Sequence, residues 1–268
     1  MAAGLLSSGD EDLSPDNVKR HLSTRFVGQA FHYFPSVTST MDVARALAVG
    51  GAPEGSVVLA EEQRQGRGRL GRAWLSPPGG NLTLSIILRP TLRELSRLTM
   101  VASLAVVQAI RQVATQEAAI KWPNDVLISG RKICGLLVDS QLQGEAVEWA
   151  VVGIGLNVNM EPAFFPEIAD SATSLYRELG RPVERLPVLI ALLASMEDYY
   201  VALRLGKPIQ REWARRLETV GKSVVAREGN RVVEGVAEAV DDEGHLLVRR
   251  SDGTLVHLVA GEATLRRV

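Results

Sequence analysis

A glycine- and arginine-rich segment at Gln63–Trp74, QRQGRGRLGRAW, contains the most specific candidate chemistry in the chain. It carries Arg64, Arg67, Arg69 and Arg72 and no acidic residue. A guanidinium group is a planar fork that matches the oxygens of a phosphate, and glycine-rich backbone can wrap closely around a ligand. The segment therefore predicts a loop that binds a phosphate-bearing ligand and becomes ordered with it. A solvated basic loop or a nucleic-acid contact remains the alternative.

The glycines of this segment also spell GxGxxG, the pattern of a dinucleotide-binding turn. That turn needs a helix directly after it, with small residues that let the helix N-terminus reach the pyrophosphate. Here arginines occupy the intervening positions, and the chain continues as WLSPPGGNLTLSI, which predicts a proline-glycine loop and a strand. The sequence therefore excludes a Rossmann-type site at this position.

A second polar cluster, KWPNDVL, spans Lys121–Leu127 ahead of an apolar run. The residue before a proline avoids the helical region, so the cluster predicts a turn that leads into a strand. Asn124 and Asp125 either only form this turn, or hold a magnesium nucleotide or orient an amine. In the next segment, GRKICGLLVDS, Lys132 follows a bend at Gly130, either as a solvated strand end or as a further cation near the arginines.

A third segment, VVGIGLNVNM at Val151–Met160, predicts a strand that contains Gly153 and Gly155 and ends in Asn157 and Asn159. Glycine within a strand permits close approach of a ligand, and asparagine side chains can hydrogen-bond a base or a ribose. The alternative is a bulge followed by a polar turn.

Other catalytic patterns are absent from the sequence. The GKS at 221–223 lacks the upstream glycine of a phosphate-binding P-loop, since position 216 is Arg216, and no GxSxG or HExxH occurs. The single cysteine, Cys134, is expected to be a small buried hydrophobe. The histidines are scattered, so neither a serine hydrolase nor a zinc enzyme is predicted; they are His21, His32, His245 and His257.

The composition bounds the class of protein. The 268 residues correspond to between one and two domains, and 46% hydrophobic with 23% charged residues is typical of a folded globule. The net charge of −1 provides no general attraction for nucleic acid. The N-terminus lacks the features of a signal peptide, and the densest apolar run, Val188–Met196, is about half of a bilayer span. A cytoplasmic protein without membrane contact is expected.

These candidate site residues need a mixed α+β framework to position them. A helix is expected from Pro15, after the cap Ser14 and a frayed acidic tail. Leu98–Ala114, apolar on nearly every side, predicts a helix buried across the sheet. Further helices are expected from Pro187 and along the stripe from Ile209 to Val220. After Gly221, β-branched runs and glycine turns predict a small β barrel or sheet. Strands are expected in AFHYF, SVVLAEE, NLTLSIILRP, KICGLLVDS and WAVVGIGLNVN, with a helix in STMDVARALA.

Taken together, GRGRLGRAW, KWPNDV, GRKICGLLVD and GIGLNVN, in this order, closely resemble the motifs of biotin protein ligases. The resemblance extends from about Phe31 to the C-terminus. It implies a catalytic domain with a mixed central sheet and packed helices, like that of class II synthetases, and a small SH3-like β-barrel. The expected divisions are 1–28 as a tail with a short helix, 29–220 as the catalytic domain and 221–268 as the C-terminal domain. Too few residues precede Phe31 for the DNA-binding domain of bifunctional members, so a monofunctional ligase is expected.

The resemblance also implies roles for individual residues, with Met41 departing from the asparagine that commonly follows Ser-Thr in the family. The residues expected to carry the chemistry are Lys132, Arg67, Arg69 and Asp125. Those expected to line the biotin site are Ser39, Thr40, Gln63, Arg67, Gly68, Arg69, Lys132, Gly135, Gly153 and Gly155. Those expected to contact ATP are Arg69, Arg72, Trp74, Asn124, Lys132 and Asn157. No metal ligand from the protein is assigned.

The implied reaction uses biotin, ATP and Mg²⁺, and proceeds through biotinyl-5′-AMP with loss of pyrophosphate. A lysine of a biotin carboxyl carrier protein then displaces AMP. The expected partners exclude DNA and membrane, and an exposed sheet edge allows two copies to pair as a homodimer. A lipoate or octanoate ligase of the same superfamily is the nearest alternative. A non-enzymatic anion- or RNA-binding protein is the alternative from another class.

Overall fold

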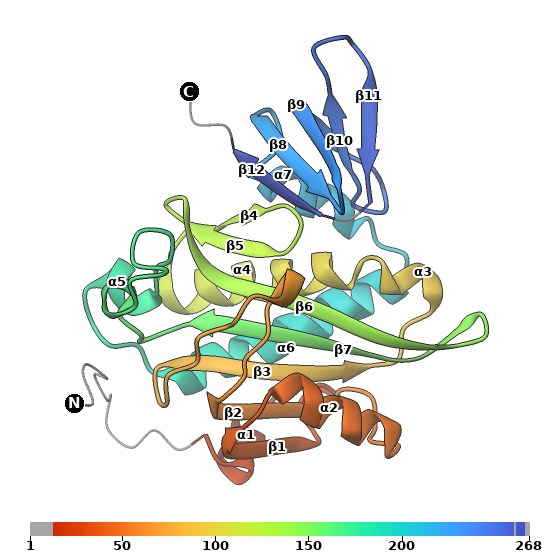
Figure 1. The fold of residues 1–268 in the computed structure, drawn as a ribbon. Coiled ribbons are helices and arrows are strands. Elements are labelled where there is room, and N and C mark those ends of the chain that lie inside the picture. Colours follow the sequence, from red (N-terminus) through yellow and green to blue (C-terminus); the bar gives the residue numbers. More distant parts are fainter. Residues whose placement is uncertain (1–12, 260, 266–268) are drawn as a thin grey trace.

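The computed structural model describes residues 13–259 and 261–265, so the expected acidic tail lies outside the described residues. Two β sheets, one large and one small, dominate the described chain (Figure 1). The large sheet has the strand order β1-β2-β3-β7-β6-β5-β4, in which β1 and β2 pair in parallel and the other neighbours are antiparallel. The expectation of a mixed α+β fold is confirmed. The strands are β1 (Phe31–Val37), β2 (Val57–Gln63), β3 (Asn81–Leu88), β4 (Ala119–Lys121), β5 (Asp125–Ile128), β6 (Arg131–Gln143) and β7 (Ala146–Asn157).

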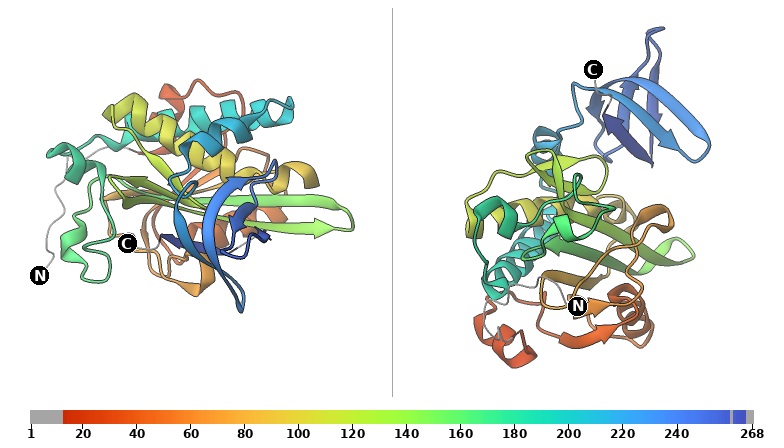
Figure 2. Two further views of the ribbon diagram at one scale, coloured as in Figure 1. Left: turned by 90° about the horizontal axis from the view of Figure 1, so that it is seen from above. Right: turned by 60° about the vertical axis from the view of Figure 1, so that its left-hand side comes forward.

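Helices cover both faces of this sheet. On one face, α4 packs against the strands and against α6, and most of its residues are buried, as its nearly uniform apolar sequence predicts (Figures 1 and 2). On the other face, α2 packs over β3 and β7. The helices are α1 (Pro15–His21), α2 (Thr40–Val49), α3 (Leu92–Leu95), α4 (Leu98–Ala114), α5 (Leu175–Leu179), α6 (Arg185–Arg204) and α7 (Ile209–Arg216), with short 3₁₀ turns at Arg69–Gly71 and Pro162–Phe164.

Helix α6 differs from the sequence-based expectation in where it begins and in the length of its apolar stretch. It begins at Arg185, which leaves Pro187 inside its first turn, and it continues to Arg204. Among the helices of the described chain it alone is long and apolar enough to cross a membrane. The apolar run counted from the sequence is shorter because polar residues interrupt the helix after Met196. The helix lies along α4, with Leu189 and Leu193 fully buried, as expected of a core helix in a folded domain.

The second sheet follows Gly221, where the sequence predicts an all-β region. Its strand order is β11-β10-β9-β8-β12, and it lies beyond β4 at one end of the large sheet (Figure 1). The turn before β10 contacts the rest of the protein, since the indole Nε1 of Trp122 donates a hydrogen bond of 2.9 Å to the carbonyl of Gly244. The strands are β8 (Ser223–Glu228), β9 (Arg231–Val240), β10 (Leu246–Arg249), β11 (Leu255–Leu258) and β12 (Glu262–Leu265).

The helical stripe expected from Ile209 to Val220 is too long. Helix α7 ends at Arg216, because Leu217 pairs with Ile120 of β4 in a parallel bridge and extends the backbone. The other strands and helices that the sequence predicts are present, and α1 begins at Pro15 as expected.

Candidate active site

The floor of the site is a strip of three glycines on the α2 face of the large sheet. Side chains alternate between the two faces of a strand, so Gly153 and Gly155 of β7 lie on the face opposite the core-facing Ile154. Gly135 of β6 pairs with Gly155, and Thr83 of β3 pairs with Gly155 on its other side. This glycine strip, Gly135, Gly153 and Gly155, carries no side chains on this face, so other parts of the chain can lie directly on the sheet.

Two side chains lie on the glycine strip. A Cβ atom at Gly155 would stand 2.3 Å from the indole of Trp74, and one at Gly135 would stand 2.9 Å from the same ring. At Gly153 a Cβ atom would stand 2.7 Å from the sulfur of Met41. These distances are too short for any real contact, so Trp74 and Met41 in these positions require the glycines.

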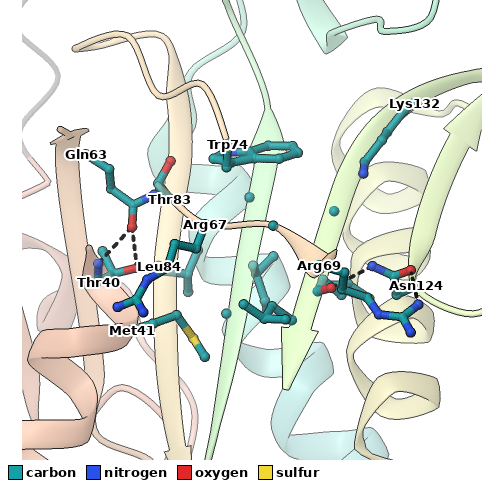
Figure 3. A pocket seen from close by; sticks show the side chains of 17 residues that line it. Thr40, Met41, Gln63, Arg67, Arg69, Trp74, Thr83, Leu84, Asn124 and Lys132 are labelled. Carbon is teal, nitrogen blue, oxygen red and sulfur yellow. Dashed lines mark hydrogen bonds between the residues drawn. The ribbon is translucent and has the colours of Figure 1, made fainter. Parts of the chain in front are cut away.

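Polar groups gather at one end of the strip, at the start of α2. The amide of Gln63 accepts hydrogen bonds from the backbone N–H of Thr40 at 2.8 Å and from its hydroxyl at 3.0 Å (Figure 3). Ser85 donates to the hydroxyl of Thr40 at 2.8 Å, and Thr83 lies on the same strand face. The amide and the hydroxyls are close enough to serve as donors and acceptors for one polar ligand group.

The arginine loop, Gly66–Trp74, crosses above the strip as a narrow hairpin. Its backbone closes through bonds from Gly68 N–H to the Arg72 carbonyl at 2.8 Å and from Trp74 N–H to the Gly66 carbonyl at 2.9 Å. Leu70 at the tip has a φ of 56° and is 72% exposed. No helix long enough for a dinucleotide site follows, which agrees with the exclusion made from the sequence.

Cationic groups gather at the opposite end of the strip. The ammonium of Lys132 lies 2.7 Å from the carboxylate of Asp125 and 5.5 Å from the centre of the Trp74 ring. Arg69 donates a hydrogen bond of 3.1 Å to the side-chain oxygen of Asn124 (Figure 3). Burial lowers the pKa of Arg69, which nonetheless stays protonated, as arginine does in proteins. An anionic ligand group at this end would meet two fixed cations.

The other arginines of the loop point elsewhere. Arg67 is directed toward Thr40 and Met41 rather than toward Lys132, and it pairs with Asp42 (Figure 3). Arg72 pairs with Glu262 of the second sheet and does not line the cavity. The arginine loop therefore touches three separate parts of the chain.

A cavity of about 50 Å³ lies between the strip and the loop, with room for only a few water molecules. It brings together eleven of the residues that sequence reasoning selected, namely Thr40, Gln63, Arg67, Gly68, Arg69, Trp74, Asn124, Lys132, Gly135, Gly153 and Gly155.

Four selected residues do not line this cavity. Asp125 is beneath Lys132, and Arg72 is at the second sheet. Ser39 is buried, and its hydroxyl has no hydrogen-bond partner among the described residues. Asn157 is buried and donates to the carbonyl of Thr173 at 3.0 Å.

Several lining residues escaped sequence reasoning. Thr83 carried a usable signal, because Thr83 and Ser85 alternate with apolar residues along β3 and therefore share a face. The remaining ones are ordinary apolar residues of the sheet that carry no such signal, namely Leu84, Leu136, Leu137 and Ile154. Met41, noted only as a departure from the family pattern, lines the cavity directly.

A larger cavity of about 310 Å³ adjoins the cationic end. It lies between the large sheet, α4 and the second sheet, and Arg69 and Asn124 line both cavities. Trp122, His245 and Val259 contribute to its other walls. Cys134 takes no part in either cavity; it is buried in the core, where burial raises the pKa of its thiol and keeps it protonated.

Comparisons with known proteins agree with this geometry. Residues 33–157 match the Biotin/lipoate A/B protein ligase family, and residues 219–266 match the Biotin protein ligase C terminal domain. The bifunctional ligase/repressor BirA of Bacillus subtilis is 38% identical over 246 residues, which cover 90% of this chain and 76% of that protein. The biotin--[acetyl-CoA-carboxylase] ligase of Paracoccus denitrificans is 34% identical over 232 residues, covering 80% and 92%.

Among solved structures, the biotin protein ligase of Aquifex aeolicus in complex with biotin and ATP superposes with a TM-score of 0.77. It is 28% identical and the match covers 90% of this chain and all of that one. Sequence, fold and the arrangement of the cavity agree, and the chain belongs to the biotin protein ligase family.

Proposed function

We propose that this ligase transfers biotin to a lysine of a biotin carboxyl carrier protein at the expense of ATP, through biotinyl-5′-AMP. The observation that carries the proposal is the order of groups along the cavity. Amide and hydroxyl groups stand at one end, the glycines with Trp74 and Met41 lying on them form the apolar middle, and cations stand at the other end. Biotin has a ureido group, an apolar body and a carboxylate in the same order.

In the first step the biotin carboxylate attacks the α-phosphorus of ATP and pyrophosphate leaves. Negative charge accumulates on the phosphoryl oxygens, and Arg69 and Lys132 stabilise it from fixed positions. Magnesium enters as part of the Mg·ATP substrate, since Mg²⁺ at nucleotide sites is held largely by phosphate oxygens and water. The proposal assigns Trp74 and Asn124 to the nucleotide, together with Arg72 and Asn157 beside the cavity.

In the second step the lysine amine attacks the carbonyl carbon of the mixed anhydride, an amide bond forms and AMP leaves. The amine must lose a proton, since its ordinary pKa is about 10.4. Asp125 is the proposed acceptor, because its carboxylate lies at the cationic end beside Lys132. The larger cavity supports an approach of the carrier protein from the side of the second sheet, since Arg69 and Asn124 border both spaces.

The proposal divides the chain into a tail and short helix at 1–28, a catalytic domain at 29–220 and an SH3-like domain at 221–268. We propose neither DNA nor a membrane as a partner. We propose that two copies of the chain can pair through an exposed sheet edge. The free thiol of Cys134 and the use of ATP favour the cytoplasm as its compartment.

The test is pyrophosphate release by the purified protein with Mg·ATP and biotin, lipoate or octanoate. The proposal expects release with biotin alone, followed by transfer of labelled biotin to the acceptor lysine when a carrier domain is added. If lipoate or octanoate is preferred, the protein is still an ATP-dependent acid–protein ligase, but the assignment of biotin as its substrate is wrong. Absence of release with all three acids, accompanied by salt-sensitive RNA binding, would overturn the enzyme itself.

A further inference from the structure

Arg67 of the arginine loop does not point at the reacting end of the cavity. Its guanidinium extends toward Thr40 and Met41, while Arg69 of the same loop extends toward Asn124 (Figure 3). The partner of Arg67 is the carboxylate of Asp42, which lies in the first turn of α2. Asp42 itself does not line the cavity.

The Asp42 carboxylate is held in place from a second side. Arg45, one turn further along α2, lies 3.2 Å from the same Oδ1 atom. Arg45 also donates to Asp139 of β6 at 2.5 Å. An acidic residue in the first turn of a helix is favoured by the helix dipole as well. Asp42 is therefore a fixed anchor beside the polar end of the cavity.

We propose that Asp42 is a positioning residue that latches the arginine loop over the biotin end of the cavity through Arg67. The inference rests on the proposed function for its kinetic consequences. Arg67 closes the loop and retains the bound ligand, whereas Arg69 and Lys132 stabilise charge at the phosphorus. Loss of the latch speeds escape of biotin and of biotinyl-5′-AMP without slowing the chemical step.

The size of the effect follows from exposure. The side chains of Arg67 and Asp42 are 45% and 39% exposed, so solvent screens their attraction. Pairs of this kind change an equilibrium by about two- to five-fold. The latch therefore adjusts how long the loop stays closed and is not needed for folding.

The first test needs no ligand. Amide hydrogen exchange is measured at Gly68 and Trp74, whose N–H groups are bonded within the loop. The variant Asp42→Asn keeps the shape of the side chain and removes its charge, and we expect about two- to five-fold faster exchange at both amides. The matched control is Asp139→Asn, which removes the same charge beside Arg45 without touching Arg67. Equal exchange in Asp42→Asn and wild type would overturn the latch.

The second test separates the two roles assigned to the loop. With Asp42→Asn we expect a raised KM for biotin and faster loss of labelled biotinyl-5′-AMP in a chase, by about two- to five-fold, with the single-turnover rate of pyrophosphate release unchanged. Asp139→Asn is expected to match wild type. A slowed single-turnover rate in Asp42→Asn with unchanged adenylate loss would refute the latch.

A double-mutant cycle identifies the partner. If Asp42 acts through Arg67, the variant carrying both Asp42→Asn and Arg67→Gln loses adenylate no faster than Arg67→Gln alone. Additive effects would show that the two residues act independently and would overturn the proposal. If wild-type protein forms no adenylate from biotin, the proposed function fails, and the exchange measurement in the free protein still decides whether the latch exists.

Discussion

Replacing Gly155 with alanine adds a single methyl group at the centre of the glycine strip. Gly155 belongs to β7, in the middle of the large sheet, and pairs with Thr83 on one side and Gly135 on the other. The new Cβ atom would point out of the sheet into the space that the Trp74 indole occupies. The sheet is held by hydrogen bonds on both sides, so the indole must yield.

The distances set the size of the displacement. The Cβ atom would lie 2.3 Å from Cε2 and 2.5 Å from Nε1 of Trp74. Ordinary carbon contacts begin at about 3.5 Å, so the indole must move by about 1 Å or more. A misplacement of this size in a site that works by positioning costs about 10²-fold in rate, which corresponds to about 2.7 kcal/mol of transition-state stabilisation. The loop carries the strain, so the thermal midpoint should change little.

The assay is pyrophosphate release with biotin and Mg·ATP, together with thermal unfolding. The matched control is Gly50→Ala at the end of α2, where the new Cβ atom would meet backbone oxygens at an ordinary 3.4 Å and the φ of −73° suits alanine. We expect kcat/KM to fall about 10²-fold for Gly155→Ala and to stay near wild type for Gly50→Ala. A Gly155→Ala enzyme with wild-type kcat/KM would show that the position of Trp74 over the strip has no bearing on the reaction.

Three further outcomes are expected. Lys132→Ala and Arg69→Gly each lower the single-turnover rate of pyrophosphate release while circular dichroism stays unchanged, and unchanged release in both would remove them from the site. Glu197→Gln lowers the free energy of unfolding at pH 7 by about 1–3 kcal/mol in urea titration, because the buried carboxylate accepts backbone N–H bonds from residues 25–27. Burial opposes ionisation, but these bonds hold the pKa of Glu197 below its usual 4.5. The stabilisation by Glu197 is therefore fully present above pH 4.5 and is lost as the pH falls through the lowered pKa. A difference in the free energy of unfolding between variant and wild type that stays constant in acid would contradict this. Native Cys134 resists iodoacetamide until urea unfolds the chain, since burial raises the pKa of its thiol, and rapid native alkylation would refute its burial.

Local patterns in the sequence predict most of the large sheet and its central helix. The apolar run Leu98–Ala114 coincides with α4, because a segment with no polar face has to be buried along its whole length. The end of α7 could not be predicted in this way. Its apolar spacing continues to Val220, but pairing of Leu217 with Ile120, far away in sequence, ends the helix.

The candidate site was predictable where a residue type is unusual for its element. Gly153 and Gly155 are unusual within an apolar strand, and both lie at the cavity. An apolar wall residue such as Leu137 looks like any core residue of a strand, and only the folded sheet shows that it lies on the cavity face. Met41 could be noticed as an exception in a motif, but its contact with Gly153 depends on how α2 lies across β7.

The four arginines of residues 63–74 show why counting charged residues in the sequence overestimates the positive charge that faces the ligand. Read along the chain they form one cationic cluster, but Arg64 is exposed to solvent, Arg67 pairs with Asp42, Arg69 bonds Asn124 and Arg72 pairs with Glu262. Two of these partners are acids, and they lie 25 and 190 residues away in sequence, so no local pattern reveals them. The cations that remain directed at the reacting end are Arg69 and Lys132, and Lys132 itself pairs with Asp125. Attraction of an anionic substrate therefore depends on two fixed groups at short range. Added salt should weaken the binding of this substrate less than it would weaken binding to four exposed arginines, because salt screens exposed charges most strongly.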